Sequence, residues 1–201
     1  MGEEQDLLGR VRTALSKLAE GADVREVLKA VLAVVSEASG CESVGIRWRA
    51  EEDYPYYLTR GFGIDFVVQE GPLCDRDSAG LILRLPDGTP QLACLCGAVI
   101  QGRGDPSQPF FTKGGSFWTN GTNSLAQSSP VWPPGCRPRM YCNKAGYESV
   151  ALLPLRTKKG IGGLLQLNSR TPGRFSKERI ALYEQAAAEI AAAVADRIGG
   201  G

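Results

Sequence analysis

The chain has 201 residues, a net charge of +1 and 43% hydrophobic residues, which is typical of one folded domain with an apolar core. It contains six cysteines and no histidine. The near-neutral charge gives no electrostatic footprint for nucleic acid, and no apolar run approaches the roughly 18 residues of a membrane span. Because imidazole is absent, a Ser-His-Asp triad is excluded, and any transition-metal site must be built mostly from thiolate sulfur.

The first residues of the chain are polar and acidic, unlike a signal peptide, so we expect a cytoplasmic location. Structural disulfides are rare in that compartment. This favours metal binding or redox chemistry for the cysteines over structural cross-links.

Two amphipathic helices are predicted at the start of the chain. Apolar residues between 4 and 19 recur every three or four positions and end before Gly21. Asp23 with Glu26 forms a capping-box pattern for a second helix, which Gly40 ends. The alternation of Val44, Ile46 and Trp48 with polar residues then predicts a half-buried strand, with residues 54–59 as its hairpin partner.

The middle of the chain is irregular. Residues 81–85 are predicted to form a strand, and a Pro-Asp-Gly turn follows them. Residues 97–147 are dominated by Gly, Pro, Ser, Thr and Asn. A structureless loop of that length is unusual, so short helices are expected near residues 94–100 and 116–125.

Order returns in the last third of the chain. Residues 149–155 and 161–167 predict an antiparallel hairpin, and Ser176 predicts the N-cap of a final helix that reaches about Arg197. The apolar stripe of that helix has nearly the spacing of a coiled-coil seam. The layout is α+β, an antiparallel sheet with the terminal helices together on one face.

Several runs resemble a GAF domain. Residues 146–156 (GYESVALLPLR), residues 161–168 (IGGLLQLN) and the final helix resemble its C-terminal half, and residues 24–48 resemble its N-terminal half. The middle runs 94–102 (CLCGAVIQG), 105–112 (DPSQPFFT) and 115–120 (GSFWTN) resemble a cysteine-containing GAF subgroup of bacterial sensor histidine kinases.

The resemblance implies a sensory module with a ligand or cofactor between the sheet and an irregular loop and short-helix segment on its other face. It implies domains at 1–21 (a helix for dimerisation or linkage), 22–198 (the GAF domain with its signalling helix) and 199–201 (a disordered tail). The expected partners are a second copy, through the terminal helices, and an output domain such as a histidine kinase. No nucleic acid or membrane partner is expected.

Four cysteines border the middle segment and are candidate metal ligands: Cys74, Cys94, Cys96 and Cys142. Four thiolates suit tetrahedral Zn²⁺ or an iron–sulfur cluster, and a sensory role favours the cluster. The spacing matches no standard zinc or ferredoxin motif, so inert buried thiols and a thiol–disulfide pair remain alternatives. Cys136 is expected to be unengaged or a spare ligand, and Cys41 to lie in the core.

Six further residues are candidates for a cofactor or ligand pocket: Phe111, Phe117, Trp118, Asn120, Tyr141 and Glu148. Pockets are commonly lined by aromatic rings with a few polar groups. The alternative for the aromatic residues is a small core that packs the middle segment on the sheet, and for Glu148 it is a solvated surface.

Three functions therefore remain open from the sequence. The first is a non-enzymatic GAF sensor with a cysteine-bound cluster or Zn²⁺. The second is an enzyme resembling the GAF-type free methionine sulfoxide reductases, which use a nucleophilic cysteine and resolving cysteines. The third is a module for a small organic ligand, with the cysteines incidental.

Overall fold

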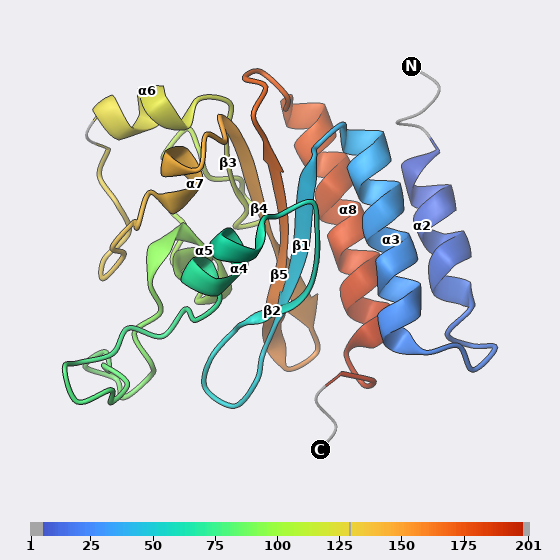
Figure 1. The fold of residues 1–201 in the computed structure, drawn as a ribbon, viewed down its shortest axis with the longest axis horizontal. Coiled ribbons are helices and arrows are strands. Elements are labelled where there is room, and N and C mark those ends of the chain that lie inside the picture. Colours follow the sequence, from blue (N-terminus) through green and yellow to red (C-terminus); the bar gives the residue numbers. More distant parts are fainter. Residues whose placement is uncertain (1–5, 129, 199–201) are drawn as a thin grey trace.

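A five-stranded antiparallel sheet organises the computed structural model, which describes residues 6–128 and 130–198 (Figure 1). The strand order is β2-β1-β5-β4-β3. The strands are β1 (Ser43–Trp48), β2 (Tyr56–Arg60), β3 (Phe117–Thr119), β4 (Ser149–Thr157) and β5 (Gly160–Ser169). The predicted C-terminal hairpin is confirmed, because β4 and β5 pair along their whole length.

Three long helices lie together on one face of the sheet: α2 (Leu7–Ser16), α3 (Val24–Ser39) and α8 (Lys177–Val194) (Figure 1). Asp23 caps α3, since its Oδ1 accepts hydrogen bonds from Arg25 N at 2.9 Å and Glu26 N at 3.0 Å. Gly40, with φ of 64°, ends that helix in the left-handed conformation. The predicted N-cap of α8 is also present, because Ser176 Oγ accepts from Arg179 N.

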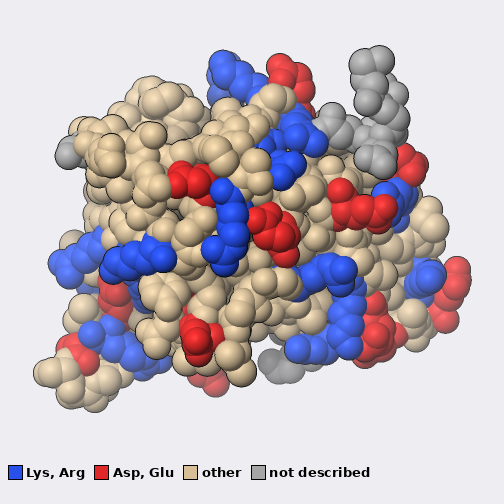
Figure 2. All heavy atoms as spheres, turned by 45° about the horizontal axis from the view of Figure 1, so that its top comes forward, with Lys and Arg blue, Asp and Glu red and all other residues tan. Residues whose placement is uncertain are grey.

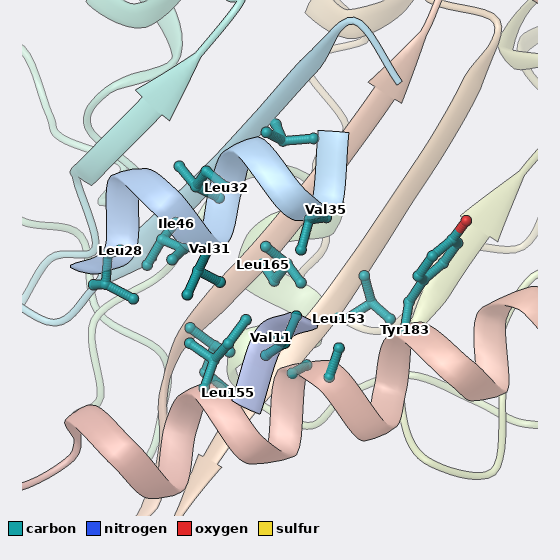
Figure 3. Packing of buried hydrophobic residues seen from close by; sticks show 14 of the residues in the cluster. Val11, Leu28, Val31, Leu32, Val35, Ile46, Leu153, Leu155, Leu165 and Tyr183 are labelled. Carbon is teal, nitrogen blue, oxygen red and sulfur yellow. The ribbon is translucent and has the colours of Figure 1, made fainter. Parts of the chain in front are cut away.

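The core on this face is almost wholly apolar. Figure 3 shows α3 placing Leu28, Val31 and Leu32 over Ile46 and Leu165 of the sheet. The stripe of α8 that resembles a coiled-coil seam is buried in this same core, including Ile190 and Val194 at 0% exposure. The apolar stripe of α8 therefore packs against the core of its own chain.

Short helices and loops cover the opposite face: α4 (Ile64–Glu70), α5 (Cys94–Ile100), α6 (Thr122–Gln127) and α7 (Tyr141–Lys144). The helix predicted near 94–100 is confirmed as α5. Residues 116–125 differ from the prediction, since they contain β3 before α6 begins. The fold class predicted from the sequence is confirmed, with the terminal helices on one face and the irregular segment on the other.

Two predictions about strands are wrong. Residues 81–85 form isolated bridges, Arg76 with Ile82 and Arg84 with Pro90, and not a strand of the sheet. These residues form bridges only with other residues of the same loop and with no strand of the sheet, so they do not extend the sheet. In addition, β1 is buried on both faces and not on one, because the short-helix layer covers the side that carries Arg47.

None of the helices in residues 6–128 and 130–198 is long and apolar enough to cross a membrane. On the face drawn in Figure 2, Lys and Arg side chains are interspersed with Asp and Glu, and neither sign forms a continuous area. The predicted tail 199–201 lies outside the described residues.

Candidate functional site

The short-helix face carries a cluster of three thiols, which we call the thiol cluster: Cys94, Cys96 and Cys142. All three line one cavity of about 40 Å³, together with Phe117, Tyr141 and other residues from α5, α7 and β4. Cys94 and Cys96 come from the first turn of α5, and Cys142 comes from α7. The fold thus brings Cys142 next to Cys94 and Cys96, although Cys142 lies 46 positions after Cys96 in the sequence.

Cys94 has an unusual backbone conformation. Its φ is 62°, in the left-handed region that residues with a Cβ rarely adopt. Its N–H donates to Arg137 O at 3.1 Å, which ties α5 to the loop before α7. Strained conformations of this kind persist only where surrounding contacts enforce them, and they concentrate at functional sites.

The Cys94 sulfur is prepared as a thiolate. A hydrogen bond from the Cys96 thiol lowers the pKa of Cys94 to about 6, and backbone N–H groups of Arg139, Leu95 and Cys96 add to the effect, although burial opposes it. The same hydrogen bond and burial raise the pKa of Cys96 well above its usual value. The two opposite pKa shifts favour a state in which the pair shares one proton, held on Cys96, while Cys94 carries the negative charge.

Cys142 stays protonated, since burial and the nearby Cys94 raise its pKa to about 12. Two amides from β5 lie beside it. Gln166 Nε2 donates to Cys142 Sγ at 3.8 Å. Asn168, with 0% exposure, has a buried Nδ2 that finds no hydrogen-bond acceptor within the described ranges. The same side chain acts to lower the pKa of Cys142, against the larger effects of burial and of Cys94.

Two charged residues complete the surroundings of the cluster, and neither was singled out from the sequence. Arg47 is fully buried and donates to backbone oxygens of Tyr54 at 3.1 Å, Gly71 at 2.8 Å and Glu70 at 2.5 Å. Its guanidinium lies 3.7 Å from the centre of the Tyr56 ring. Glu70 is 3% exposed, and burial together with the negative charge of Cys94 raises its pKa to about 7.

The other cysteines stand apart from the thiol cluster. Cys74, predicted as a fourth ligand, does not line the cavity, and its Sγ donates to Glu52 O at 3.2 Å. Cys136 Sγ donates to Cys94 O at 3.5 Å, so it supports the α5 backbone. Cys41 belongs to the helical-side core, as expected.

The six candidate pocket residues divide into two groups. Phe117 and Tyr141 line the cavity, and Phe111 packs beside Phe117 with ring centres 5.7 Å apart. Trp118 instead packs against the helical-side core. Asn120 accepts from Phe175 N at 2.8 Å and donates to Phe175 O at 2.7 Å, and Glu148 binds Asn123 in α6. Trp118, Asn120 and Glu148 therefore do not line this cavity.

The residues present fit a thiophilic ion in chemistry and in size. Soft thiolates select soft or borderline metals, and about 40 Å³ is room for an ion or a water molecule. In the described part of the chain, however, no three Cys, Asp or Glu side chains already converge on one point as metal ligands. An ion would require the thiol side chains to turn toward it.

The fold agrees with a comparison to family models. The GAF domain model matches residues 23–194. The chain belongs to the GAF domain family. GAF domains are in general sensory modules, so the coarse function expected from the sequence stands. The match does not decide whether the chain belongs to the cysteine-containing histidine-kinase subgroup.

Solved structures similar to this GAF domain show the same fold at low sequence identity. The GAF domain of a phosphoenolpyruvate-protein phosphotransferase from Coxiella burnetii has a TM-score of 0.60 and 16% identity, covering 96% of this chain and 94% of that one. Free methionine-R-sulfoxide reductase from Neisseria meningitidis has a TM-score of 0.55 and 16% identity, with 95% and 89% covered. A domain of a putative sensor histidine kinase from Sinorhizobium meliloti has a TM-score of 0.53 and 12% identity, with 85% and 89% covered. No curated protein matches the chain.

Proposed function

We propose that this GAF domain is a sensory module whose thiol cluster binds one thiophilic metal ion of the Zn²⁺ class. The observation that carries the proposal is that three thiols line one small cavity and that one of them, Cys94, is already held as a thiolate. Metal binding requires deprotonated thiols, so the ion would displace the protons of Cys96 and Cys142 into solvent.

The cavity size favours a single ion over the iron–sulfur cluster that the sequence suggested. A cluster contains at least two irons and two sulfides, which need more room than about 40 Å³. An organic ligand in this cavity is disfavoured for the same reason, because pockets for such molecules measure roughly 300–1,000 Å³.

A route for the signal supports the sensory role. Thr112 Oγ1 and Ser116 Oγ both donate to Glu184 Oε1 of α8, each at 2.6 Å. These hydroxyls flank Phe111 and Phe117, which pack beside the cavity. Movement of the aromatic pair on ion binding would therefore act on α8 through Glu184. We propose that α8 passes the change to an output domain such as a histidine kinase.

The homodimer through the terminal helices stays a prediction, and the fold restricts how it would form. Because the apolar stripe of α8 is buried in its own protomer, a second copy would contact the outer face of the helix. That face exposes Ala181, Gln185, Ala188 and Ala192. Light scattering on the purified chain measures the oligomeric state.

Metal analysis of the chain purified without air tests the proposed function. We expect one Zn²⁺ per chain after titration, with loss of binding in Cys94→Ser, Cys96→Ser and Cys142→Ser. Cys41→Ser and Cys74→Ser are the matched controls and should retain the ion, because neither thiol lines the cavity. Equal Zn²⁺ binding by the wild type and by a variant lacking all three cluster thiols would contradict the proposal. Detection of iron with an equimolar amount of sulfide would instead show that the site holds an iron–sulfur cluster.

One observation favours a second candidate, a thiol reductase. Cys94 is a thiolate beside two further thiols, which is the arrangement of a nucleophile with resolving cysteines. Reduction of free methionine sulfoxide with a thiol reductant is the assay. The small cavity predicts no turnover above a Cys94→Ser control, and robust turnover would establish the enzyme instead.

A further inference from the structure

A second and larger cavity, of about 800 Å³, lies at the end of the sheet where β1 ends and β2 begins. The turn between β4 and β5, the start of α3 and the end of α8 complete its wall. These parts lie together at the lower end of the molecule in Figure 1, beside the C-terminus. Among the described residues, none lines both this cavity and that of the thiol cluster. Its volume falls within the roughly 300–1,000 Å³ of pockets for small organic molecules.

Three cations from three different elements line this cavity: Arg25 in the first turn of α3, Arg49 directly after β1, and Lys159 in the β4–β5 turn. Within residues 6–128 and 130–198, none of the three forms an ion pair. Glu51 is the one acidic residue among the lining residues described, so the wall has a net charge of +2. A concave surface with an excess of one charge focuses its field, and this one therefore attracts anions.

Arg49 is held in a position that suits an anionic ligand. Its Nε donates to Glu51 O at 3.0 Å, which fixes the guanidinium against the turn after β1. Its two Nη groups have no hydrogen-bond acceptor among the described residues. A planar guanidinium fork of this kind binds phosphate or carboxylate oxygens with paired hydrogen bonds.

Aromatic rings form the apolar part of the wall. The Arg25 guanidinium lies over the Tyr57 ring, 5.2 Å from its centre. A guanidinium can stack on planar groups, so the open side of Arg25 offers a surface for a planar ring of a ligand. Trp48 also lines the cavity, and a Cβ at Gly162 would come within 3.3 Å of its Cη2 and Cζ2 atoms. Glycine at position 162 thus keeps the space beside the indole open.

We propose that this cavity binds a small organic dianion, namely a phosphate monoester attached to a planar ring. Such a group carries a charge of about −1.5 to −2 at pH 7, which matches the +2 of the lining. The phosphate would contact Arg49 and Lys159, and the ring would lie between Arg25 and Trp48. This site is additional to the proposed ion site and does not depend on it.

The position of the cavity indicates what such a ligand would do. Ala195 and Ile198, which follow the C-terminal end of α8, belong to its wall. Trp48 Nε1 donates to Ile198 O at 3.1 Å and so joins this segment to the sheet. A ligand in the cavity would restrain the end of the helix that we propose as the route to an output domain. It would therefore act as a second input, beside the ion.

Isothermal titration calorimetry on the full chain tests the proposal with two probes, adenosine monophosphate and flavin mononucleotide. Both are phosphate monoesters with planar rings, and comparing them distinguishes a nucleotide from a flavin as the source of the ligand. At least one should bind about tenfold or more tightly than inorganic phosphate and than its own dephosphorylated form, adenosine or riboflavin. Failure of both probes to bind, or equal binding with and without the phosphate, would overturn the proposal.

Charge variants then locate the site. Arg25→Gln, Arg49→Gln and Lys159→Gln should each weaken binding of the tighter probe by about tenfold, because each removes a contact to the ligand. Lys158→Gln is the matched control, since Lys158 is the neighbouring exposed lysine of the same turn and does not line the cavity. An equal loss in Lys158→Gln and Lys159→Gln would contradict the assigned position.

A variant that fills the cavity separates a shaped site from attraction by surface charge. Ala50→Trp changes an exposed residue of the wall, keeps all three cations and occupies the space for the ring, so it should abolish binding. Undiminished binding in Ala50→Trp would overturn the proposal. Cys94→Ser should bind the probe as the wild type does, so failure of this proposal and failure of the ion site are distinguishable.

Discussion

The two faces of the central sheet are built from the same strands and yet differ in kind. On β1 and β5, Ile46 and Leu165 point into the apolar core beneath the terminal helices, while Arg47 and Gln166 point the other way, toward the thiol cluster. Successive side chains of a strand point to opposite faces of the sheet, so the same strands supply both sets of side chains. One face is packed for stability, and the other keeps buried charges, thiols and amides. The second face is therefore the one to which we assign the proposed ion site.

The largest expected effect is a difference in how much a substitution on each face lowers the free energy of unfolding. Leu165→Ala removes a fully buried side chain from the helical-side core and should lower the free energy of unfolding by about 2–5 kcal/mol. Cys142→Ala on the cavity side should cost less than about 1.5 kcal/mol, because it deletes one sulfur beside an existing cavity. Urea denaturation of both variants measures the contrast, and equal losses would contradict it.

The second prediction concerns the pH dependence of stability without metal. The pKa of Glu70 is about 7 in the folded chain, above its value of 4.5 in the unfolded chain. The folded state therefore binds more protons, so this group's contribution is present below pH 4.5 and is lost as the pH rises through 7. The loss amounts to at most about 3 kcal/mol.

Glu70→Gln lacks this titration. Its stability relative to the wild type should rise between about pH 4 and pH 8 by up to about 3 kcal/mol, as measured by urea denaturation at each pH in the presence of a chelator. The pKa of Cys94, lowered to about 6, gives a slope of the opposite sign above pH 6 in both proteins. A difference between the two proteins that does not vary with pH would mean that Glu70 is not buried as described.

The third prediction tests the link between the faces. Glu184→Gln replaces the anionic acceptor of Thr112 and Ser116, so it should lower stability by about 1–2 kcal/mol. Hydrogen exchange of α8 should respond to Zn²⁺ in the wild type and not in this variant. Glu178→Gln, an exposed position in the first turn of the same helix, is the control and should keep the response. If hydrogen exchange of α8 in Glu184→Gln still responds to Zn²⁺ as in the wild type, the coupling to α8 does not pass through Glu184.

The smallest expected effect is a reversal of the usual preference for alanine over glycine in a helix. Cys94→Gly should be more stable than Cys94→Ala by about 1 kcal/mol, because φ of 62° strains any residue that has a Cβ. At Ala98, in the same helix, substitution by glycine should destabilise the chain by about the same amount or more. Thermal unfolding of these variants compares the two positions. Greater stability of Cys94→Ala than of Cys94→Gly would show that the position is not strained.

The fold was largely predictable, because its elements depend on local patterns. The cap at Asp23, the stop at Gly40 and the apolar stretches of β4 and β5 are each visible in the sequence, and each appears in the structure. The segment 81–85 was mispredicted for the same reason. Its composition suits a strand, but strand formation in a sheet depends on a partner that composition does not reveal.

The site was only partly predictable. Of the four cysteines predicted as metal ligands, Cys94, Cys96 and Cys142 line one cavity and Cys74 lies outside its lining, while their role as ligands stays a prediction. Arg47, Glu70 and Asn168 were missed, because charged and amide side chains are usually exposed and nothing local marks them as buried. The alternation of Arg47 with Ile46 and of Asn168 with Leu167 did place them on the face opposite the core. Only the short-helix layer, which forms through distant contacts, makes that face an interior.

X-ray absorption at the Zn²⁺ edge, on the chain purified without air and loaded with one equivalent of the ion, tests the central claim most directly. The account predicts one bound ion with sulfur ligands from Cys94, Cys96 and Cys142, in a shell that is unchanged in Cys74→Ser. A wild-type chain that binds no more Zn²⁺ than a variant lacking Cys94, Cys96 and Cys142 would contradict it.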